Sequence, residues 1–363
     1  MKVTIITVCL NAEKTIERTI LSVIEQSYGI DDIEYIIIDG NSTDGTKCII
    51  EKYSQYIAEY ISESDTGLYN AMNKGLSLAT GDVIGILNAD DWYDKDAIKT
   101  VINAFEDADI VYGNIYSADP DGEIRKKKKP CSLSDLWVHM CLFHPATFVR
   151  RDVYAAEGTF NETYKIAADY DFLLKCYARG RKFKYIDEYL AYFRSGGISC
   201  TDFARTAIEA AKVSNSYAQF APDTDRVARE NKYALNVAGF REHLEHDDRH
   251  MFDIFKRESA DKLFLWGAGI WGNRILDAFI RNDIDICGFI DSDPNKTGKI
   301  IHGYDIKKID ILKELENVTV IVAIIQRNTE IEDILRNYKV NYLFLEDWIK
   351  MSDFYPNEVC EYE

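Results

Sequence analysis

Residues 83–92, Val-Ile-Gly-Ile-Leu-Asn-Ala-Asp-Asp-Trp, are the most informative stretch of this sequence. The apolar run 83–87 is long enough for one buried strand, and soon after it come two adjacent carboxylates, Asp90 and Asp91. In an open α/β sheet the carboxyl ends of the strands face the ligand crevice. Two acids at such a place repel each other unless a cation or a basic partner offsets their charge. The stretch therefore predicts a site that holds a divalent metal against an anionic ligand.

Strand and helix patterns alternate through the first part of the chain. The predicted strands are 3–10, 34–38, 59–62, 83–87 and 110–112, and the predicted helices are about 11–26 (capped by Asn11), 43–53, 68–78 and 95–105. Repeated strand-then-helix order implies right-handed crossovers and a mostly parallel sheet. From 113 to 200 the pattern is less regular, with a strand or loop at 139–149 and a helix at 169–179. We expect an α/β domain over residues 1–200.

The second half of the chain predicts a connector and a smaller domain. Residues 201–258 are rich in Ala, Arg, Glu and His and lack a strand signal, which predicts helices joining two domains. A new strand-and-helix pattern then starts at Lys262, and it predicts a small Rossmann-like α/β domain over residues 259–347. The acidic, poorly patterned residues 348–363 are expected to form a tail.

Charge excludes some classes of partner. The net charge of −18 argues against a nucleic-acid-binding protein, which would need a basic face. A local exception is the basic cluster Arg125-Lys126-Lys127-Lys128-Lys129. Such a cluster is most often a solvated loop, and the alternative is contact with lipid headgroups or with a lipid-phosphate acceptor.

Cysteine usage and hydropathy indicate a cytoplasmic protein. The 8 cysteines are scattered without a Cys-x-x-Cys pair, as in proteins of a reducing compartment. The apolar run 3–10 is cut short by Asn11 and Glu13, so it is interpreted as a first strand rather than a signal peptide. No run approaches the roughly 20 apolar residues that span a bilayer. Peripheral contact with the inner face of the membrane and assembly into a homo-oligomer both stay open.

Polar side chains follow each of the first predicted strands. They are Thr7 and Asn11 after the first strand, Asp39 after the second, Asp65 and Lys74 in the next segment, and Asn88 beside Asp90 and Asp91. Such a set suits a sugar nucleotide, because a carboxylate accepts from a base or a ribose, a lysine meets phosphate, and a cation bridges the diphosphate.

Each of these residues also has a plainer interpretation. Asp90 and Asp91 could cap the next helix, Asp39 could form a turn, and Asp169 could be a helix cap. Lys74 could end a solvated helix, and His144 could be a hydrogen-bonded structural histidine rather than a phosphate or acceptor contact.

Several segments together resemble a known family. They are Ile-Ile-Asp-Gly-Asn-Ser-Thr-Asp-Gly-Thr (37–46), Ser-Glu-Ser-Asp-Thr-Gly-Leu-Tyr-Asn-Ala-Met-Asn-Lys-Gly (62–75), Leu-Asn-Ala-Asp-Asp (87–91), Phe-His-Pro-Ala-Thr-Phe (143–148), Ala-Asp-Tyr-Asp (168–171) and Gly-Gly-Ile-Ser (196–199). In this order, and through about residue 200, they resemble the family 2 glycosyltransferases of the GT-A fold. These are enzymes of bacterial capsule, O-antigen and exopolysaccharide assembly.

The resemblance implies roles for particular residues. It implies that Asp90 and Asp91 bind Mn²⁺ or Mg²⁺, that Asp169 is the catalytic base of an inverting reaction, and that His144 is a possible acceptor or phosphate contact. Donor-binding residues implied by the family or by the strand-end pattern are Thr7, Asn11, Asp39, Asp65, Lys74 and Asn88. This chain departs from the family in having Asn88 at the first acid of the metal-binding element and Ala168 before the base.

The second domain carries a glycine-rich turn. Gly267, Gly269 and Gly272 follow a predicted strand and open a helix, and Asp291 ends the next strand nineteen residues after Gly272. This is the context of a dinucleotide-binding site, and the segment resembles the Rossmann-like modules that accompany sugar-modifying enzymes. Because it is short for a complete dehydrogenase, we interpret it as a noncatalytic module for assembly or for binding a nucleotide or NAD(P).

The sequence as a whole predicts an inverting, metal-dependent hexosyltransferase. Its expected substrates are a nucleotide-sugar, UDP-linked, and a glycan or lipid-linked glycan acceptor in cell-surface polysaccharide biosynthesis. Two alternatives stay open. One is a bifunctional protein whose second domain is an NAD(P)-dependent sugar-nucleotide-modifying enzyme. The other is a noncatalytic sugar-nucleotide sensor, which Asn88 and Ala168 weakly favour.

Overall fold

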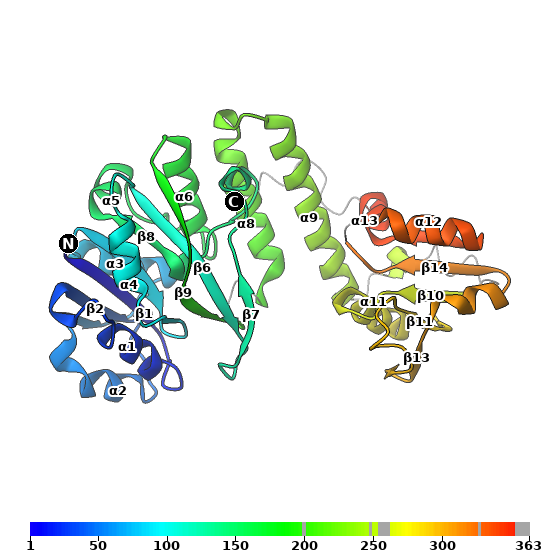
Figure 1. Cartoon of the computed structure of the whole chain (residues 1–363), viewed down its shortest axis with the longest axis horizontal. Helices are drawn as coiled ribbons and strands as arrows, with labels where there is room; N and C mark the ends of the chain where they lie inside the picture. Colours follow the sequence, from blue (N-terminus) through cyan, green and yellow to red (C-terminus); the bar gives the residue numbers. More distant parts are fainter. Residues whose placement is uncertain (198–200, 247–248, 253–261, 326–327, 353–363) are drawn as a thin grey trace. The chain divides into compact units, whose positions relative to one another are not determined.

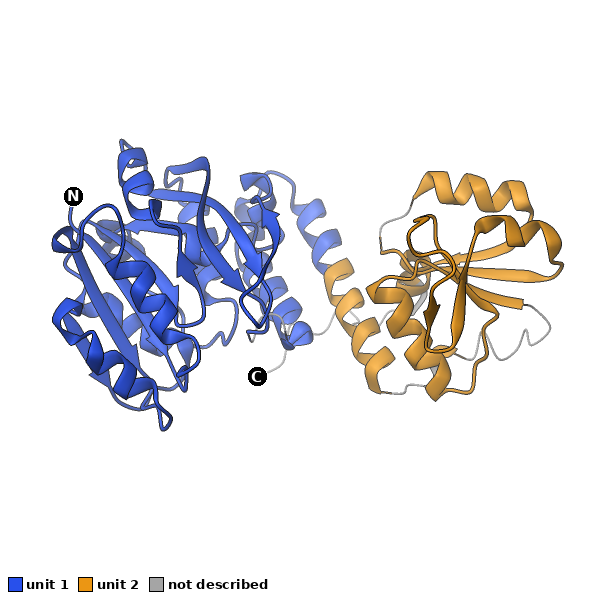
Figure 2. Ribbon diagram, turned by 60° about the horizontal axis from the view of Figure 1, so that its bottom comes forward, with its two compact units in different colours: residues 1–231 blue, residues 232–363 orange. Residues whose placement is uncertain are grey.

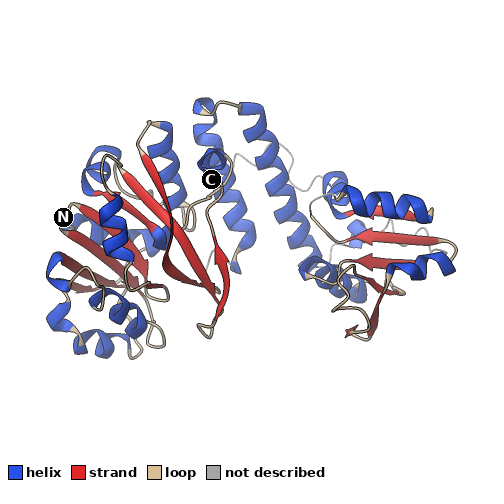
Figure 3. Cartoon of the chain, in the orientation of Figure 1, coloured by secondary structure: helices blue, strands red, loops and turns tan. Residues whose placement is uncertain are grey.

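The structure, a computed structural model, describes residues 1–197, 201–246, 249–252, 262–325 and 328–352. The chain divides into two compact units, residues 1–231 and 232–363 (Figure 2). Each unit contains its own β-sheet and its own helices (Figure 3). The predicted α/β class, with a second sheet-containing domain toward the C-terminus, is confirmed.

The sheet of the first unit has 9 strands in the order β3-β2-β1-β4-β8-β6-β9-β5, with β7 paired to β6 (Figure 1). The strands from β3 to β4 are parallel, β8 is antiparallel to its neighbours β4 and β6, and β6 and β9 are parallel to each other. The bounds are β1 (Val3–Cys9), β2 (Ile33–Asp39), β3 (Glu59–Ser62), β4 (Val83–Asn88), β5 (Trp92–Tyr93), β6 (Ile110–Ala118), β7 (Ile124–Lys128), β8 (Thr147–Arg150) and β9 (Phe183–Arg194).

Helices cover both faces of this sheet. Successive side chains of a strand point to opposite faces, so Ile6 of β1 packs in one hydrophobic core and Ile5 in the other. The first core also contains side chains of α3 (Leu68–Leu78), α5 (Arg151–Glu157), α6 (Ala168–Ala178) and α8 (Phe203–Tyr217). The second contains side chains of α1 (Ile16–Ile24), α2 (Thr46–Lys52) and α4 (Ala97–Ala104). No helix in the described ranges is both long and apolar enough to cross a membrane.

Two local predictions for this unit were wrong. The first helix begins at Ile16 rather than after Asn11, because Asn11 adopts a left-handed conformation (φ 51°) and its side chain bonds to the next loop. The basic cluster is not a loop: Ile124–Lys128 form β7, a fully exposed strand whose partner is β6. The ambiguous stretch 139–149 forms a short 3₁₀ helix (His144–Ala146) followed by β8.

The residues that we predicted as a connector are helical where the structure describes them. Val213 of α8 and Val227 of α9 (Thr224–His246) are buried in a core of the first unit. The helix α9 continues across the division between the units at residues 231 and 232. Residues 247–248 and 253–258 of the predicted connector lie outside the described residues.

The second unit has a six-stranded sheet in the order β12-β13-β11-β10-β14-β15. The five strands from β13 to β15 are parallel, in the strand order of a doubly wound sheet. The bounds are β10 (Lys262–Trp266), α11 (Ile270–Arg281), β11 (Gly288–Ile290), β12 (Ile300–Ile301), β13 (Tyr304–Lys307), β14 (Val318–Val322), α12 (Thr329–Tyr338), β15 (Asn341–Phe344) and α13 (Leu345–Ser352). Trp348 of α13 is buried, so packed structure continues past residue 347, where we expected a tail. Residues 353–363 lie outside the described residues.

Candidate active site

Two cavities meet at the carboxyl ends of β1 and β4. The first, which we call the β1 cavity, has a volume of about 440 Å³ and is lined by Cys9, Asn11 and Asp65 among others. The second, the α6 cavity, has a volume of about 300 Å³ and is lined by His144 and by Asp169 at the start of α6. The residues that line both cavities are Leu68, Asn88, Asp90, Arg194 and Gly197.

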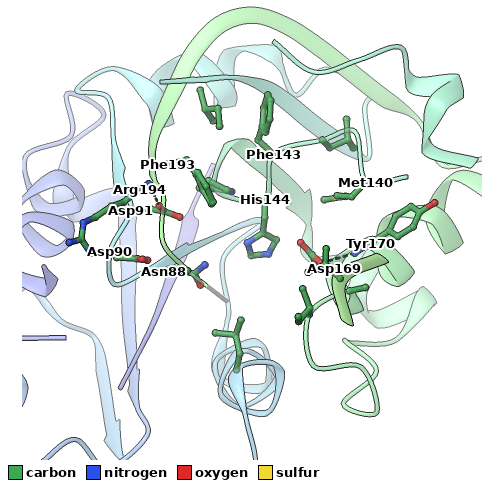
Figure 4. Close-up of a pocket in the computed structure, with 18 of the residues that line it drawn as sticks. Asn88, Asp90, Asp91, Met140, Phe143, His144, Asp169, Tyr170, Phe193 and Arg194 are labelled. Carbon is green, nitrogen blue, oxygen red and sulfur yellow. Dashed lines mark hydrogen bonds between the residues drawn. The ribbon is translucent and has the colours of Figure 1, made fainter. Parts of the chain in front are cut away.

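The two adjacent acids after β4 have different environments. The Asp91 side chain is buried, with the residue 1% exposed, and it accepts a hydrogen bond from the Arg194 N–H at 2.9 Å. Asp90 lies at the junction of the cavities and makes no hydrogen bond to another residue that the structure describes. Figure 4 shows Asp90 and Asp91 beside Arg194. Asp91, which also lines the α6 cavity, is thus hydrogen-bonded within the protein, whereas the Asp90 carboxylate has no partner among the described residues.

Burial makes this pair of carboxylates costly to ionise. It raises the pKa of Asp90, and it raises the pKa of Asp91 well above its ordinary value, with the charge of Asp90 adding to the second shift. The charge of Arg194 opposes both shifts, and its N–H also favours the ionised form of Asp91. A bound cation would offset the same repulsion.

Asn88 supplies an independent reason to place a ligand here. Its Oδ1 atom is buried and accepts no hydrogen bond from the described residues. Such an atom is costly to bury unless a ligand completes its hydrogen bonding or coordination. No cluster of three or more His, Cys, Asp or Glu side chains capable of holding a metal occurs among the described residues. The donor set nevertheless fits Mg²⁺ or Mn²⁺, since such sites commonly combine one or two protein oxygens with substrate phosphates and water.

Asp169 is held from two directions in the first turn of α6. Its carboxylate accepts a hydrogen bond from the Tyr170 N–H at 2.9 Å, and the Tyr69 hydroxyl of α3 lies 3.0 Å away. The same hydroxyl lies 2.5 Å from the Ile166 carbonyl oxygen, so its single proton is shared between two acceptors. The Tyr170 N–H and the Tyr69 hydroxyl both bond to Oδ1, and Oδ2 accepts no hydrogen bond from the part of the chain that the structure describes. Because Asp169 lines the α6 cavity, Oδ2 can face a substrate there.

Glu209 is a supporting residue that the sequence did not predict. From α8, its carboxylate accepts hydrogen bonds from three successive backbone N–H groups, those of Lys165, Ile166 and Ala167, at 2.8–3.1 Å. These residues immediately precede the helix that carries Asp169. The carboxylate therefore anchors the start of α6, across more than forty residues of sequence and with no local signal.

His144 lies between Asn88 and Asp169 (Figure 4). Its ring packs edge-on against Phe160, with centroids 6.2 Å apart. Burial lowers the pKa of His144, and the charge of Asp169 opposes the shift, so the imidazole is neutral near pH 7. A neutral imidazole can donate one hydrogen bond and accept another.

Three of the predicted donor-binding side chains line neither cavity. Thr7 is fully buried beside the Tyr35 hydroxyl, and Lys74 pairs with Glu63 at 2.8 Å. Asp39 is also fully buried, and it accepts hydrogen bonds from Ser42 and Ser62 that shape the loop after β2. Asn11, Asp65 and Asn88 do line the β1 cavity.

Arg194, at the end of β9, is a further cavity residue that the sequence analysis missed. Its N–H binds Asp91, and its guanidinium donates to the Pro120 carbonyl at 2.7 Å. The nearest sequence signal is the glycine pair Gly196-Gly197, which comes one residue after the strand and belongs to the predicted motif 196–199. Ile198 and Ser199 of that motif lie outside the described residues.

The glycine-rich loop of the second unit lies between β10 and α11, as predicted. A Cβ at Gly272 would lie 2.0 Å from the Gly267 carbonyl oxygen, so this close approach requires glycine. Gly269 immediately precedes α11, and a Cβ there would meet no atom within 4 Å. The Asp291 carboxylate accepts a hydrogen bond from the Ala268 N–H at 2.9 Å and pairs with Lys296 at 3.0 Å. Asp291 is thus bonded within the protein.

Sequence comparison relates the two units to different families. Residues 4–169 match the family described as glycosyl transferase family 2, and residues 259–342 match one described as C2185-like, N-terminal. A PGL/p-HBAD biosynthesis glycosyltransferase from Mycobacterium bovis is 31% identical over 176 residues, covering 47% of this chain and 67% of the relative. The chondroitin synthase of Escherichia coli is 32% identical over 192 residues, covering 49% of this chain and 26% of the synthase.

Two solved structures share the fold. The mannosyltransferase PcManGT from Pyrobaculum calidifontis, in complex with GDP-Man and Mn²⁺, has a TM-score of 0.53 and 17% identity, covering 77% of this chain and 86% of its own. TarS 1-349 from S. aureus, in complex with UDP, has a TM-score of 0.50 and 18% identity, covering 79% of this chain and 84% of its own. At these identities the likeness concerns the fold.

Proposed function

Because this chain belongs to glycosyl transferase family 2, it is a glycosyltransferase, and we propose that it transfers a hexose from a UDP-linked donor with inversion of configuration. The proposed acceptor is a glycan or lipid-linked glycan, and the proposed process is cell-surface polysaccharide biosynthesis. A nucleotide-sugar donor is supported by the two structural neighbours, one solved with UDP and the other with GDP-Man and Mn²⁺.

The observation that carries this proposal is the junction of the two cavities. A nucleotide in the β1 cavity would meet Asn11 and Asp65, and its diphosphate would reach Asn88, Asp90 and Arg194. The sugar would then extend past the junction into the α6 cavity, where Asp169 lies. Two adjoining cavities thus offer separate places for a leaving nucleotide and for an attacking hydroxyl.

The proposed metal ligands are the Asp90 carboxylate and the Asn88 Oδ1 atom. Both lie at the junction, and the amide oxygen is buried without a partner in the described chain. A bound Mn²⁺ or Mg²⁺ would neutralise the negative charge that develops on the departing diphosphate. The guanidinium of Arg194 adds a permanent positive charge beside the same place.

Asp169 is the proposed general base. Its carboxylate would accept the proton of the acceptor hydroxyl as that oxygen adds to the anomeric carbon, a role that matches the base of an inverting glycosidase. The Tyr170 N–H and the Tyr69 hydroxyl orient the carboxylate, and Glu209 anchors the turn before it. Neutral His144 can bind a sugar or acceptor hydroxyl between Asn88 and Asp169.

For the second unit we propose a noncatalytic nucleotide-binding or assembly module. Its parallel sheet and glycine-rich turn support a nucleotide site, whereas the hydrogen bonds of Asp291 leave that acid engaged within the protein. Incubating the full chain with NAD(P)⁺ and nucleotide sugars tests the alternative. Reduction of the cofactor would overturn the noncatalytic assignment.

The donor assignment is tested by incubating the purified chain with a panel of nucleotide sugars and Mn²⁺. Release of UDP from a UDP-sugar, above the rate measured with chelator, is the expected result. Asp169→Asn should bind UDP as the unsubstituted chain does while releasing little of it. If GDP-sugars alone are turned over, the UDP assignment fails. If no donor is bound, the sensor alternative fails together with the enzyme.

A further inference from the structure

The exposed strand β7 brings a lysine to the wall of the α6 cavity. In the antiparallel pair of β6 and β7, Lys128 lies opposite Ile115, and both residues line this cavity. Directly opposed residues of a ladder share one face of the sheet, so Lys126, opposite Ser117, points to the same side two residues further along. Lys128 does not line the β1 cavity, where we place the nucleotide.

The other basic residues of the cluster already have partners. Lys127 lies over the rings of Tyr116 and Tyr189, at 5.6 and 5.0 Å from their centroids. Lys129 pairs with Asp187 at 2.6 Å, and Arg125 pairs with Asp119. By contrast, the side-chain ammonium groups of Lys126 and Lys128 make no hydrogen bond or ion pair with any residue in the described ranges. The unengaged charges are thus those on the cavity side of β7.

The α6 cavity, to which Lys128 contributes, has a mainly apolar lining. Its apolar side chains include Ile115, which lies opposite Lys128 in the ladder, and also Met140, Leu142, Phe143 and Phe193. Figure 4 labels Met140, Phe143 and Phe193. Sugar hydroxyls placed against such a wall would find no hydrogen-bond partners there, whereas an alkyl or prenyl chain would bury apolar area against it. A cation next to this wall favours a ligand with an anionic group beside an apolar portion.

We propose that Lys128 binds a phosphate group of the acceptor, and that the neighbouring apolar wall holds the hydrocarbon portion attached to it. This inference rests on the proposed function and names the class of acceptor: an amphiphile with a phosphate close to its apolar part. The ammonium group of lysine suits a phosphate because it is a compact point charge with three donors. Lys126 would continue the basic path outward along β7.

The experiment compares two short amphiphiles on the full chain in the presence of saturating UDP and Mn²⁺. Octyl phosphate is expected to bind at least about tenfold more tightly than octanol, as one charge-assisted hydrogen bond would provide. Lys128→Ala should abolish that difference, and Lys128→Arg should keep most of it. Lys127→Ala is the matched control, because Lys127 lies on the opposite face of β7, and it should leave the difference intact.

Calorimetric titration with UDP in the same variants separates this proposal from the proposed function. Unchanged UDP binding by Lys128→Ala supports a site distinct from the donor. Equal affinity of the unsubstituted chain for octyl phosphate and octanol would overturn the proposal. It would also be overturned if Lys128→Ala lost only binding to phosphatidylglycerol vesicles, which would assign the lysine to a lipid surface, or lost only turnover of UDP-glucuronic acid, which would assign it to a sugar carboxylate.

Discussion

The β1 cavity and the α6 cavity are built from very different parts of the chain. Apart from Arg194 and Gly197, the β1 cavity is lined by residues between 8 and 90, at the ends of β1 and β4, in the segments that follow β1, β3 and β4, and at the start of α3. The α6 cavity is lined by residues from 68 to 210, and Glu209, which does not line it, anchors the turn before α6. The nucleotide side is thus a product of short strand-end loops, and the acceptor side is a product of contacts between distant segments.

This difference implies that the two sides can be damaged separately. Substitutions in the α6 cavity and its supports should lower turnover while UDP binding persists. Substitutions at the strand-end acids should lower metal-dependent UDP binding first. The distinction fails if a substitution in the α6 cavity mainly weakens UDP binding, or if a substitution at the strand-end acids lowers turnover without weakening UDP binding.

The largest expected effect is that of Asp169→Asn. The amide keeps the size of the side chain and cannot accept a proton, so kcat should fall about 10²- to 10⁴-fold, the usual contribution of a general base. The UDP dissociation constant should stay within about twofold, because the base makes no nucleotide contact in the proposed arrangement. Asp171→Asn is the matched control: it lies on the same helix, bonds to Tyr217 and lines neither cavity. If kcat falls equally in the two variants, Asp169 is not the general base.

The next effect distinguishes Asp90 from Asp91. Asp90→Asn should weaken UDP binding at least about tenfold in the presence of Mn²⁺, as expected on loss of a metal-ligating carboxylate, with little change in thermal stability. Asp91→Ala should instead lower the free energy of unfolding by about 1–3 kcal/mol, because it leaves the partly buried Arg194 N–H without its acceptor. Titration with and without Mn²⁺, together with thermal unfolding, measures both. The assignment fails if Asp90→Asn binds UDP equally well in both conditions.

A third prediction concerns Glu209, which supports the acceptor side from outside the family-matched segment. Glu209→Ala deprives three backbone N–H groups of their acceptor and should cost about 1–3 kcal/mol of stability. Because α6 then loses its anchor, kcat should fall several-fold more than the donor KM rises. Glu230→Ala, an exposed position on α9, is the control and should change neither quantity. Loss of stability with kcat unchanged would make Glu209 a purely structural residue.

The same difference between the two sides decides how much could be predicted from the sequence. The strand predicted at 83–87 differs from β4 by one residue, because an unbroken apolar run beside a glycine has few other outcomes. Once the strands are placed, the polar residues at or just after their ends can be predicted too, and Asn88 and Asp90 are examples. The interior hydrogen bonds of Thr7 and Asp39 could not be foreseen, since a buried partner leaves no mark on the local pattern.

Much of the α6 cavity and its supporting residues could not be predicted from the sequence. The 12-residue strand β9 was missed because its charged residues Lys184, Asp187 and Glu188 interrupt the alternation of a strand. Its register against β6 also shifts twice, so the alternation is not continuous along the strand. Arg194, at its end, was missed with it. Glu209 bonds to residues 42 to 44 positions away, a pairing that only the folded chain defines.

The smallest expected effect is a pH dependence from His144, which lies on the acceptor side. Burial lowers its pKa, so the folded state binds a proton at this position less readily than the unfolded state does. A group with a depressed folded pKa contributes stability above its unfolded pKa of about 6.5 and loses it as the pH falls. Between pH 7.5 and pH 5.5 the free energy of unfolding should therefore fall more steeply for the unsubstituted chain than for His144→Gln, by about 1.4 kcal/mol per pH unit at most. Thermal unfolding at several pH values measures this difference.

The affinity for UDP should not show the same difference in pH dependence, because His144 lines only the α6 cavity. If His144→Gln instead alters the pH dependence of UDP binding and leaves that of unfolding unchanged, the histidine belongs to the nucleotide side and the division between the cavities is misplaced.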